Sequence, residues 1–337
     1  MKRIDGREGG GQLLRLAVGL AALSETPIVI EHVRGARDEP GLRAQHVAAV
    51  EAVAALSGAD CEGVEVGSET VTFDPGPLTG GEVSVEVATA GSIPLVFDAV
   101  LPLAMGTAEP ITVHATGGTD VKWSPPIGFQ QHVKLPLLRQ VGLDAEIHVD
   151  RRGFYPRGGG SATLQISPSS VDPVVYAERG PLQSVQVHSV ATEDLADAEV
   201  AARQVEGVTA TLAGKTAVPI EATTESVPAY STGTSVLLVA TYEHSIAGFD
   251  QLGERGWPAE AVGESAAESF LEFHATEAAV DGHLADQLLP FVAIRGGEIT
   301  IPEVTEHVDS ASSLLASFGH DLAIATSENP VRVSAPN

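Results

Sequence analysis

A histidine near the C-terminus, His307 in the segment Thr305-Glu306-His307, is the first candidate for covalent chemistry. A free histidine titrates at about pH 6.5, so near neutrality the imidazole has a lone pair that can attack phosphorus. Nucleophilic catalysis of this kind divides a difficult substitution into two easier steps. His307 is one of eleven histidines, and an isolated histidine is more often structural. Its interpretation therefore depends on the other motifs of the chain.

Arginines and glycines near the N-terminus have the character of a phosphate site. Residues 1–43 carry seven of the nineteen basic residues, six of them arginine, against six acidic residues. Arginine binds phosphate through two parallel N–H donors, and glycines at a helix start let phosphate approach the backbone N–H groups. The segment Glu8-Gly9-Gly10-Gly11 lacks the Lys-Ser/Thr pair of a P-loop. The alternatives are arginines that pair with nearby acids and glycines that form only a tight turn.

The composition limits the class of protein. The chain has 337 residues and a formal net charge of −26, with only four lysines. This acidic excess is typical of a surface adapted to high salt, and a cationic partner is the less favoured interpretation. Cys61 is the only cysteine, so no intrachain disulfide can form, which fits a cytoplasmic location. We find no apolar run long enough to span a bilayer and no secretory signal, and expect no membrane association.

The order of elements indicates an α/β (α+β) fold built from a repeated unit. The first 88 residues predict the order β-α-β-α-β-β, with helices to about residue 24 and over about 42–56. Residues 90–166 predict a second helix-containing stretch of the same order. We therefore expect repeated β-α-β-α-β-β units of roughly 80 residues, forming a large catalytic domain of residues 1–177 and 257–337.

Residues 178–256 differ from this pattern, because glycine clusters and arginines become sparse. A strand at 185–190, a helix at 196–212 and strands at 218–223 and 235–242 predict a small inserted β-α-β-β domain with a packing role. Beyond it we expect one long helical region over about 258–289, a strand at 299–301 and a short helix near 310–317.

Taken together, these motifs resemble the RNA 3′-terminal phosphate cyclases. The matching stretches follow one another in the order typical of that family, and they are residues 5–15, 34–37, 40–42, 45–46, 90–92, 117–120, 125–126, 152–160, 284–288 and His307. None is specific alone, but jointly they run nearly from end to end. The resemblance implies repeated β-α-β-α-β-β units with a small inserted domain.

The resemblance also implies a reaction. The histidine that matches His307 attacks the α-phosphate of ATP and keeps AMP as a phosphoramidate. AMP then passes to an RNA 3′-phosphate, and the vicinal 2′-hydroxyl attacks this activated phosphate and expels AMP, which leaves a 2′,3′-cyclic end. The implied ligands are ATP, a divalent cation (Mg or Mn) and RNA with a 3′-phosphate end, and a homodimer is left open.

Roles for further residues follow from the same resemblance. The implied nucleotide-binding residues are Asp98, Pro125, Pro126, His283, Leu284, Ala285, Asp286 and Gln287. The implied phosphate and RNA path comprises Arg15, Arg34, Arg37, Gln45 and His46, with Glu8 at the metal or the phosphates. The chain departs from the family pattern at His283 (often aromatic), Asp98 (glutamine expected), Gly128 (aspartate expected) and Ser310-Ala311 (Thr-Asn expected).

Three other functions remain as alternatives. A non-enzymatic relative acting in ribosomal RNA processing would lack the histidine, so His307 argues against it. A carbohydrate-phosphate transferase with a similar repeated unit would need no nucleotide-linked histidine. A pure RNA-binding module would need a basic stripe or stacking aromatic residues, whereas this chain has 4% aromatic residues and a charge of −26.

Overall fold

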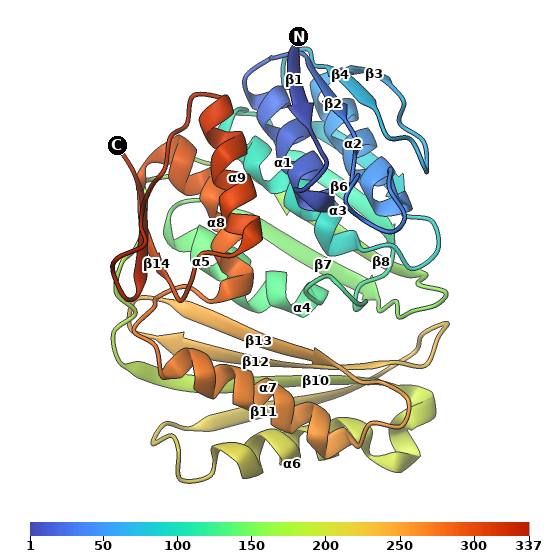
Figure 1. Cartoon of the computed structure of the whole chain (residues 1–337). Coiled ribbons are helices and arrows are strands. Elements are labelled where there is room, and N and C mark those ends of the chain that lie inside the picture. Colours follow the sequence, from blue (N-terminus) through green and yellow to red (C-terminus); the bar gives the residue numbers. More distant parts are fainter. Residues whose placement is uncertain (337) are drawn as a thin grey trace.

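Three four-stranded sheets with the same strand order make up the large domain of the protein (Figure 1). The computed structural model describes residues 1–336. The first unit consists of β1 (Lys2–Asp5), α1 (Gly10–Leu23), β2 (Ile28–Glu31), α2 (Ala44–Ser57), β3 (Asp60–Glu62) and β4 (Val71–Asp74). Its sheet order is β1-β2-β4-β3, in which β1 and β2 are parallel and the other neighbours are antiparallel.

The second unit repeats this arrangement. It consists of β5 (Gly81–Glu86), α3 (Ile93–Val100), η1 (Leu101–Met105), β6 (Ile111–Gly117), α4 (Ile127–Phe129), η2 (Gln130–Lys134), α5 (Leu135–Gln140), β7 (Ala145–Arg151) and β8 (Gly160–Ile166). The sheet order is β5-β6-β8-β7, again with only the first two strands parallel. The expected repeat is thereby confirmed.

A third unit, which the sequence did not reveal, is assembled from two distant segments. It consists of β9 (Val174–Tyr176), α8 (Gly282–Arg295), β14 (Gly297–Ile301), α9 (Glu306–Ser317), β15 (Ala323–Ala325) and β16 (Val331–Ala335). The parallel pair β9–β14 and the antiparallel pairs β14–β16 and β15–β16 reproduce the order of the first two sheets. The insertion lies between the first strand and the first helix of this unit, which hides the repeat in the sequence.

The inserted segment has a different topology. It consists of β10 (Leu182–Thr192), η3 (Glu193–Ala198), α6 (Val200–Leu212), β11 (Ile220–Val227), β12 (Thr234–Tyr242), β13 (Ile246–Leu252) and α7 (Ala259–His274). Its sheet order is β11-β10-β12-β13, so the first strand is central rather than at the edge. The predicted β-α-β-β order lacked β13.

The region beyond residue 256 also differs from the expectation. The single long helical region predicted for 258–289 is wrong, because α7 ends at His274 and α8 begins at Gly282. Helix α7 packs with α6 against the inserted sheet, and its apolar face shares a core with β12 that extends to Ala278. We therefore propose that the inserted domain continues past the expected boundary at residue 256 to about residue 278.

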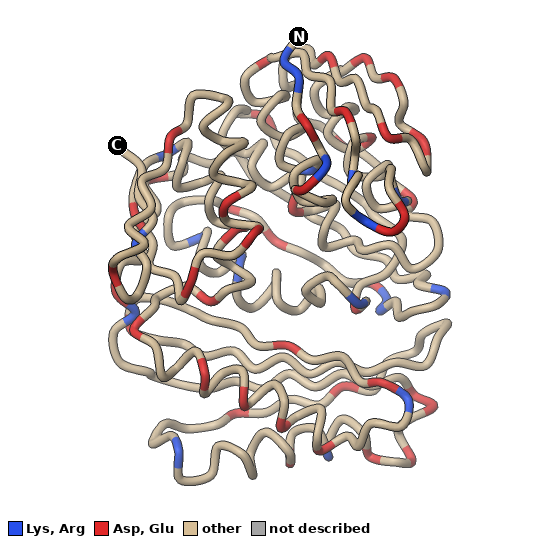
Figure 2. Tube along the Cα trace, in the orientation of Figure 1, with Lys and Arg blue, Asp and Glu red and all other residues tan. Residues whose placement is uncertain are grey.

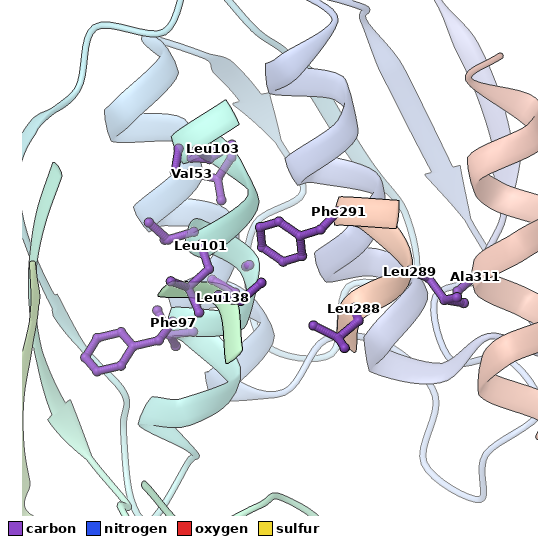
Figure 3. Packing of buried hydrophobic residues seen from close by; sticks show 14 of the residues in the cluster. Val53, Phe97, Leu101, Leu103, Leu138, Leu288, Leu289, Phe291 and Ala311 are labelled. Atoms are coloured by element: carbon purple, nitrogen blue, oxygen red, sulfur yellow. The ribbon is translucent and has the colours of Figure 1, made fainter. Parts of the chain in front are cut away.

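Two hydrophobic cores meet at the inserted sheet. Strand β12 alternates between them, because Val236 and Leu238 face α6 and α7, whereas Leu237 and Val239 join the core of the large domain. A strand that is buried on both faces reads as a continuous apolar run, as this segment does. The larger core draws on all three units, and Figure 3 shows side chains from several of their helices converging there.

Polar contacts tie the second unit to the inserted domain as well. The Asp120 carboxylate accepts hydrogen bonds from Ser235 of β12 at 2.8 Å and from Thr119 at 2.6 Å, and pairs with Arg152 at 3.2 Å. These contacts hold the loop 119–126 beside the inserted sheet. Within residues 1–336 no helix has both the length and the apolar character needed to cross a bilayer.

Candidate active site

His307 lies in the first turn of α9, where the backbone N–H groups point out of the helix. Thr305 is the N-cap residue, and its side chain accepts the Val308 N–H at 3.2 Å. Val308 is buried, which anchors this turn, while His307 is exposed. Partial desolvation, followed by the charges of Arg15 and Arg37, lowers the pKa of His307. The imidazole is therefore uncharged at neutral pH and can act as a nucleophile.

The glycine-rich segment of the first unit lies beside the arginines. Gly10 has a left-handed backbone with φ of 59°, and a Cβ placed there would be 3.5 Å from Nη2 of Arg37. Helix α1 begins at Gly10 and packs against α9, the helix that carries His307. A helix N-terminus beside two arginines is suited to bind phosphate.

His46, in the first turn of α2, is buried against the same glycines. Its Nδ1 accepts the backbone N–H of Arg43 at 2.9 Å, so the proton of the neutral ring is on Nε2. A Cβ at Gly11 would lie 2.1 Å from this Nε2, which excludes any side chain at Gly11. Burial, and then the charges of Arg15, Arg34 and Arg43, lower the pKa of His46 to about 3. His46 is therefore a neutral N–H donor beside the glycine-rich segment.

Arg34 and Gln45 form hydrogen bonds to other groups of the protein. Arg34 donates to the backbone oxygens of Glu39 at 3.0 Å and Gly41 at 2.8 Å, which holds its own loop. Gln45 accepts the N–H of Ser92 at 3.1 Å and so links the first unit to the start of α3. Of the five residues expected along the phosphate path, these two support the loops, whereas Arg15, Arg37 and His46 lie around the glycines and His307.

The first helices of the three units each contribute a charged, partly buried residue to one cluster. Arg15 of α1, Asp98 of α3 and Asp286 of α8 all lie in the second turn of their helices. Asp98 accepts hydrogen bonds from Lys134 and Gln130, each at 2.6 Å, and the Lys134 side chain is only 2% exposed. We call Arg15, Asp98, Lys134 and Asp286 the central cluster.

The central cluster holds one acid that titrates near neutrality. Burial, and then the charge of Asp98, raise the pKa of Asp286 to about 7, against the opposing charges of Lys134 and Arg15. Burial also lowers the pKa of Arg15, although its neighbours Asp98 and Asp286 favour the charged form. Arg15 thus connects this cluster electrostatically to His307.

The segment expected to bind the nucleotide begins α8. Asp281 caps this helix by accepting the N–H groups of His283 at 3.0 Å and Leu284 at 2.9 Å. Leu284 and Ala285 are core residues, so a contact from either to a nucleotide would have to come from the backbone. His283 is exposed, and Gln287 donates to its backbone oxygen at 2.8 Å. The Oε1 atom of Gln287 is buried without a hydrogen-bond partner.

Two proline residues and one acid complete the expected site. Pro126 is buried and Pro125 partly so, at the end of the loop 119–126. Glu8 is exposed at the start of the glycine-rich segment. In the part of the chain that the structure describes, no group of three or more His, Cys, Asp or Glu side chains could hold a metal ion. A carboxylate beside a phosphate site nevertheless suits Mg²⁺, which is often held by one or two carboxylates together with substrate phosphates.

Lys134, Gln130 and Asp281 belong to this site region but were not expected from the sequence. Lys134 carried a signal, since it is one of four lysines and directly precedes the apolar stretch Leu135–Leu138 that begins α5. A lysine beside such a stretch is rarely buried without a partner. Its partner, Asp98, lies 36 residues away and could not be identified from spacing.

Comparison with known proteins gives matches over nearly the whole chain. The sequence model for "RNA 3'-terminal phosphate cyclase" matches residues 6–321. A curated RNA 3′-terminal phosphate cyclase of Halobacterium salinarum is 51% identical over 347 residues, covering 99% of this chain and all of the relative. Those of Hyperthermus butylicus and Pyrococcus furiosus are 43% and 40% identical, covering 88% and 90% of this chain and 84% and 89% of their own lengths. The enolpyruvyl transferase NikO from Streptomyces tendae matches 48% of the chain with a TM-score of 0.26 and 17% identity, which is too weak to bear on the fold.

Proposed function

The chain belongs to the RNA 3′-terminal phosphate cyclase family, and we propose that His307 is the nucleophile of its ATP-dependent reaction. A ring nitrogen attacks the α-phosphorus of ATP, the bond to pyrophosphate breaks, and AMP remains on the ring as a phosphoramidate. An oxygen of the RNA 3′-phosphate then attacks the AMP phosphorus and breaks the P–N bond. Finally, the 2′-hydroxyl attacks the 3′-phosphorus and expels AMP, which gives the 2′,3′-cyclic phosphate.

The observation that carries this proposal is the position of His307 at the start of α9, uncharged and beside two arginines. A cationic imidazole would have no lone pair to donate, and both Arg15 and Arg37 disfavour that cation. The same guanidinium groups offset the charge that develops on the departing pyrophosphate. One arrangement therefore serves both the nucleophile and the leaving group.

We propose that the triphosphate lies between α9 and the glycine-rich segment. The backbone at Gly9–Gly11, the Nε2–H of His46 and the guanidinium of Arg37 are the donors that support this position. Arg34 and Gln45 would act by holding the surrounding loops. A divalent cation, Mg or Mn, would be held by Glu8 together with the phosphates, where it would neutralise charge.

For the nucleotide we propose a position along the start of α8, near Pro125 and Pro126. The unpartnered Oε1 of Gln287 offers an acceptor for an adenine N–H, and the exposed His283 ring offers a stacking surface. Asp286, whose pKa is raised to about 7, would contact the nucleotide with its carboxyl partly protonated at neutral pH. Asp98 would have an indirect role, because its carboxylate already accepts hydrogen bonds from Lys134 and Gln130 and would hold these two side chains in place.

Labelling with ATP that carries ³²P at the α-phosphate tests the nucleophile. The wild type should retain label through denaturing electrophoresis and lose it on mild acid, whereas His307→Ala should retain none. His320→Ala, which removes a histidine just past the far end of α9, should label like the wild type. Equal labelling of His307→Ala would place the AMP on another residue.

A second stage tests the acceptor. Addition of RNA with a 3′-phosphate should discharge the labelled protein and yield a 2′,3′-cyclic end, whereas RNA with a 3′-hydroxyl should not. A folded wild type that binds RNA but takes no label would favour the non-catalytic alternative in ribosomal RNA processing. We also propose a cytoplasmic location, supported by the single cysteine, and leave a homodimer to a light-scattering measurement.

A further inference from the structure

The exposed aromatic side chains of residues 1–336 gather at one place. Trp123, Tyr155, Tyr230 and Trp257 are 95%, 74%, 57% and 36% exposed, and the described chain has no other large aromatic residue that is exposed to this degree. The whole sequence contains two tryptophans and four tyrosines, so both tryptophans and half of the tyrosines are in this group. A fully exposed tryptophan is costly to solvate, so such a concentration calls for a binding partner.

These residues are on four loops around the junction of the second unit and the inserted domain, namely 119–126, 150–160, 228–233 and 253–258. We call this surface the aromatic rim. The first two loops are joined by the Thr119 N–H, which donates to Gly153 O at 2.8 Å. The backbone N–H of Arg157 donates to Ser231 Oγ at 3.0 Å, which joins the second loop to the third.

The other loop contacts fix individual side chains. A Cβ at Gly159 would lie 2.3 Å from the Tyr230 ring, so this ring rests directly on the glycine backbone. Lys122 pairs with Glu254 at 2.8 Å and joins the fourth loop to the first. The rim is therefore a connected surface that is built before any ligand arrives.

The aromatic rim is basic in an acidic protein. Its four loops contain five basic residues (Lys122, Arg151, Arg152, Arg157 and Arg255) and three acidic ones (Asp120, Asp150 and Glu254), a net of +2 against −26 for the whole chain. Two of the three acids are paired with rim cations, Asp120 with Arg152 and Glu254 with Lys122. Figure 2 shows acidic positions spread over both layers, while basic positions are few. Cations and aromatic rings together are the composition of a surface for single-stranded nucleic acid.

The contact between Arg151 and Tyr230 combines a cation and an aromatic ring of the rim. The Arg151 guanidinium lies over the Tyr230 ring, with Cζ 4.6 Å from the ring centroid, and Nε donates to Gly159 O at 2.6 Å. The guanidinium is thereby held over the ring, leaving its remaining N–H groups for an anion. A phosphate that approaches Arg151 would bring its base toward the exposed tyrosine.

The rim is continuous with the proposed active site. Trp123 directly precedes Ser124 and Pro125, and Ser124 Oγ is 2.6 Å from Ser92 Oγ. The Ser92 N–H in turn donates to Gln45, the neighbour of His46. A chain of direct contacts thus leads from the donors around His307 to the loop that carries Trp123.

We propose that the aromatic rim binds the single-stranded body of the RNA substrate, several nucleotides 5′ of the reacting end, by stacking its bases on Trp123 and Tyr155. This inference rests on the proposed function, which supplies the RNA. High salt screens the attraction between phosphates and cations within a few ångströms, whereas stacking does not depend on charge. In a protein with an acidic surface, stacking is therefore the contact that can hold RNA away from the reacting end.

Fluorescence anisotropy with 5′-labelled RNA at high potassium chloride tests the rim independently of catalysis. Two RNAs with a 3′-phosphate are compared, a dinucleotide and one of about twelve nucleotides, which is within the usual site size for single strands. The double variant Trp123→Ala/Tyr155→Ala should weaken binding of the long RNA by about tenfold or more and leave the dinucleotide unchanged. Val66→Ala, at another exposed apolar residue, is the matched control and should change neither.

Further variants distinguish stacking on aromatic rings from apolar contact and from electrostatic attraction. Trp123→Phe should restore most of the affinity for long RNA, whereas Trp123→Leu, which keeps apolar bulk, should not. Arg157→Gln should reduce the salt dependence of long-RNA binding, while the aromatic double variant should keep the wild-type salt slope.

Three results would overturn the proposal. They are unchanged affinity of the double variant for the long RNA, an equal loss for both RNA lengths, and a shift from dimer to monomer in light scattering without a change in RNA affinity. The last would assign the rim to contact with a second copy of the chain. Absence of AMP labelling in the wild type would instead count against the proposed function, because the anisotropy measurement needs no ATP.

Discussion

Two polar regions of this protein, each with partly buried ionisable side chains, stabilise those side chains in opposite ways. The central cluster keeps charges and pairs them, with Lys134 and Asp98 at 2.6 Å in the interior. At the junction between the second unit and the inserted domain, His132 of η2 and His188 of β10 stack with centroids 4.1 Å apart and planes 7° from parallel. These two rings are held uncharged rather than paired.

The surroundings of the histidine stack explain this difference. Burial, and then His188 and Arg152, lower the pKa of His132 to about 4, against the weaker effect of Glu225. Burial and Arg152 also lower the pKa of His188. The stack adjoins a cavity of about 20 Å³, room for about one water molecule, and the buried Nε2 of His188 has no protein partner. A cation here would meet Arg152, so neutrality is the favourable state.

Each of the two regions is therefore stable with its ionisable groups in a different protonation state. The central cluster favours a protonated Asp286, whereas the junction favours two deprotonated histidines. Because the two regions take up protons in opposite senses over nearly the same range, from about pH 4 to about pH 7, their contributions to the pH dependence of stability should oppose each other there. Four changes test this contrast, in order of decreasing expected effect.

Removal of the lysine should damage the central cluster most. In Lys134→Met the Asp98 carboxylate keeps only the Gln130 bond, so the free energy of unfolding should fall by about 3–5 kcal/mol, the usual cost of breaking a buried ion pair. Urea unfolding at constant salt measures the loss. Lys122→Met, at a half-exposed pair with Glu254, is the control and should cost about 1 kcal/mol or less. Similar losses for both lysines would contradict a buried cluster.

The equivalent change at the junction should cost less. In Arg152→Met the Asp120 carboxylate retains hydrogen bonds from Thr119 and Ser235, so we expect a loss of about 1–3 kcal/mol in the same unfolding measurement. The variant also removes a cation that opposes protonation of the histidine stack. A loss as large as that of Lys134→Met would mean that the Arg152–Asp120 pair stabilises the junction as much as the Lys134–Asp98 pair stabilises the central cluster.

The pH dependence of the central cluster should follow Asp286. Its pKa of about 7 in the folded state exceeds the value of 3.8 in the unfolded chain, so the folded protein binds more protons between these limits. Stability from this group is present at low pH and is lost as pH rises through about 7. Asp286→Asn, which mimics the protonated form, should therefore lose less stability than the wild type between about pH 4 and about pH 7 in urea titrations. An identical decline in both proteins would refute a raised pKa.

Protonation of the histidine stack should change stability with pH in the opposite direction to Asp286. The change should be smaller, because both rings are partly exposed to water. In the unfolded chain each histidine has a pKa near 6.5, whereas the pKa of His132 in the folded protein is about 4. Stability should therefore fall as pH drops from about 6.5 to about 4. His132→Gln should flatten this decline relative to His148→Gln, which removes a histidine from the exposed edge strand β7. A flattened decline in the His148→Gln protein alone would place the effect elsewhere.

Local patterns in the sequence predicted the first two units well, because each consists of consecutive elements with clear periodicity. They could not reveal the third unit, since β9 and β14 pair across an insertion of more than 100 residues, from Val174 to Gly297. Helix α7 was misassigned for a related reason. Its apolar stripe fits either core, and only packing against Val236 and Leu238 decides between them.

In the candidate site, too, some features could be predicted from the sequence and others could not. His307, the glycine-rich segment and the arginines were identifiable because residue type and motif carry the chemistry. Arg15, Asp98 and Asp286 were each predicted to contact ligand, yet the structure also places Arg15 near both acids and pairs Asp98 with Lys134. Leu284 and Ala285 matched the motif, but their side chains pack in the core.

The sequence by itself therefore determined the types of chemistry available and the repeated β-α-β-α-β-β order. Only the tertiary structure decided which helices meet, where the charges lie relative to one another, and that the exposed aromatic residues form one rim. The physical reason is that periodicity reports how a segment turns its own faces toward core or water. Which partner covers each face depends on packing between segments far apart in the chain, and such packing leaves no local signal.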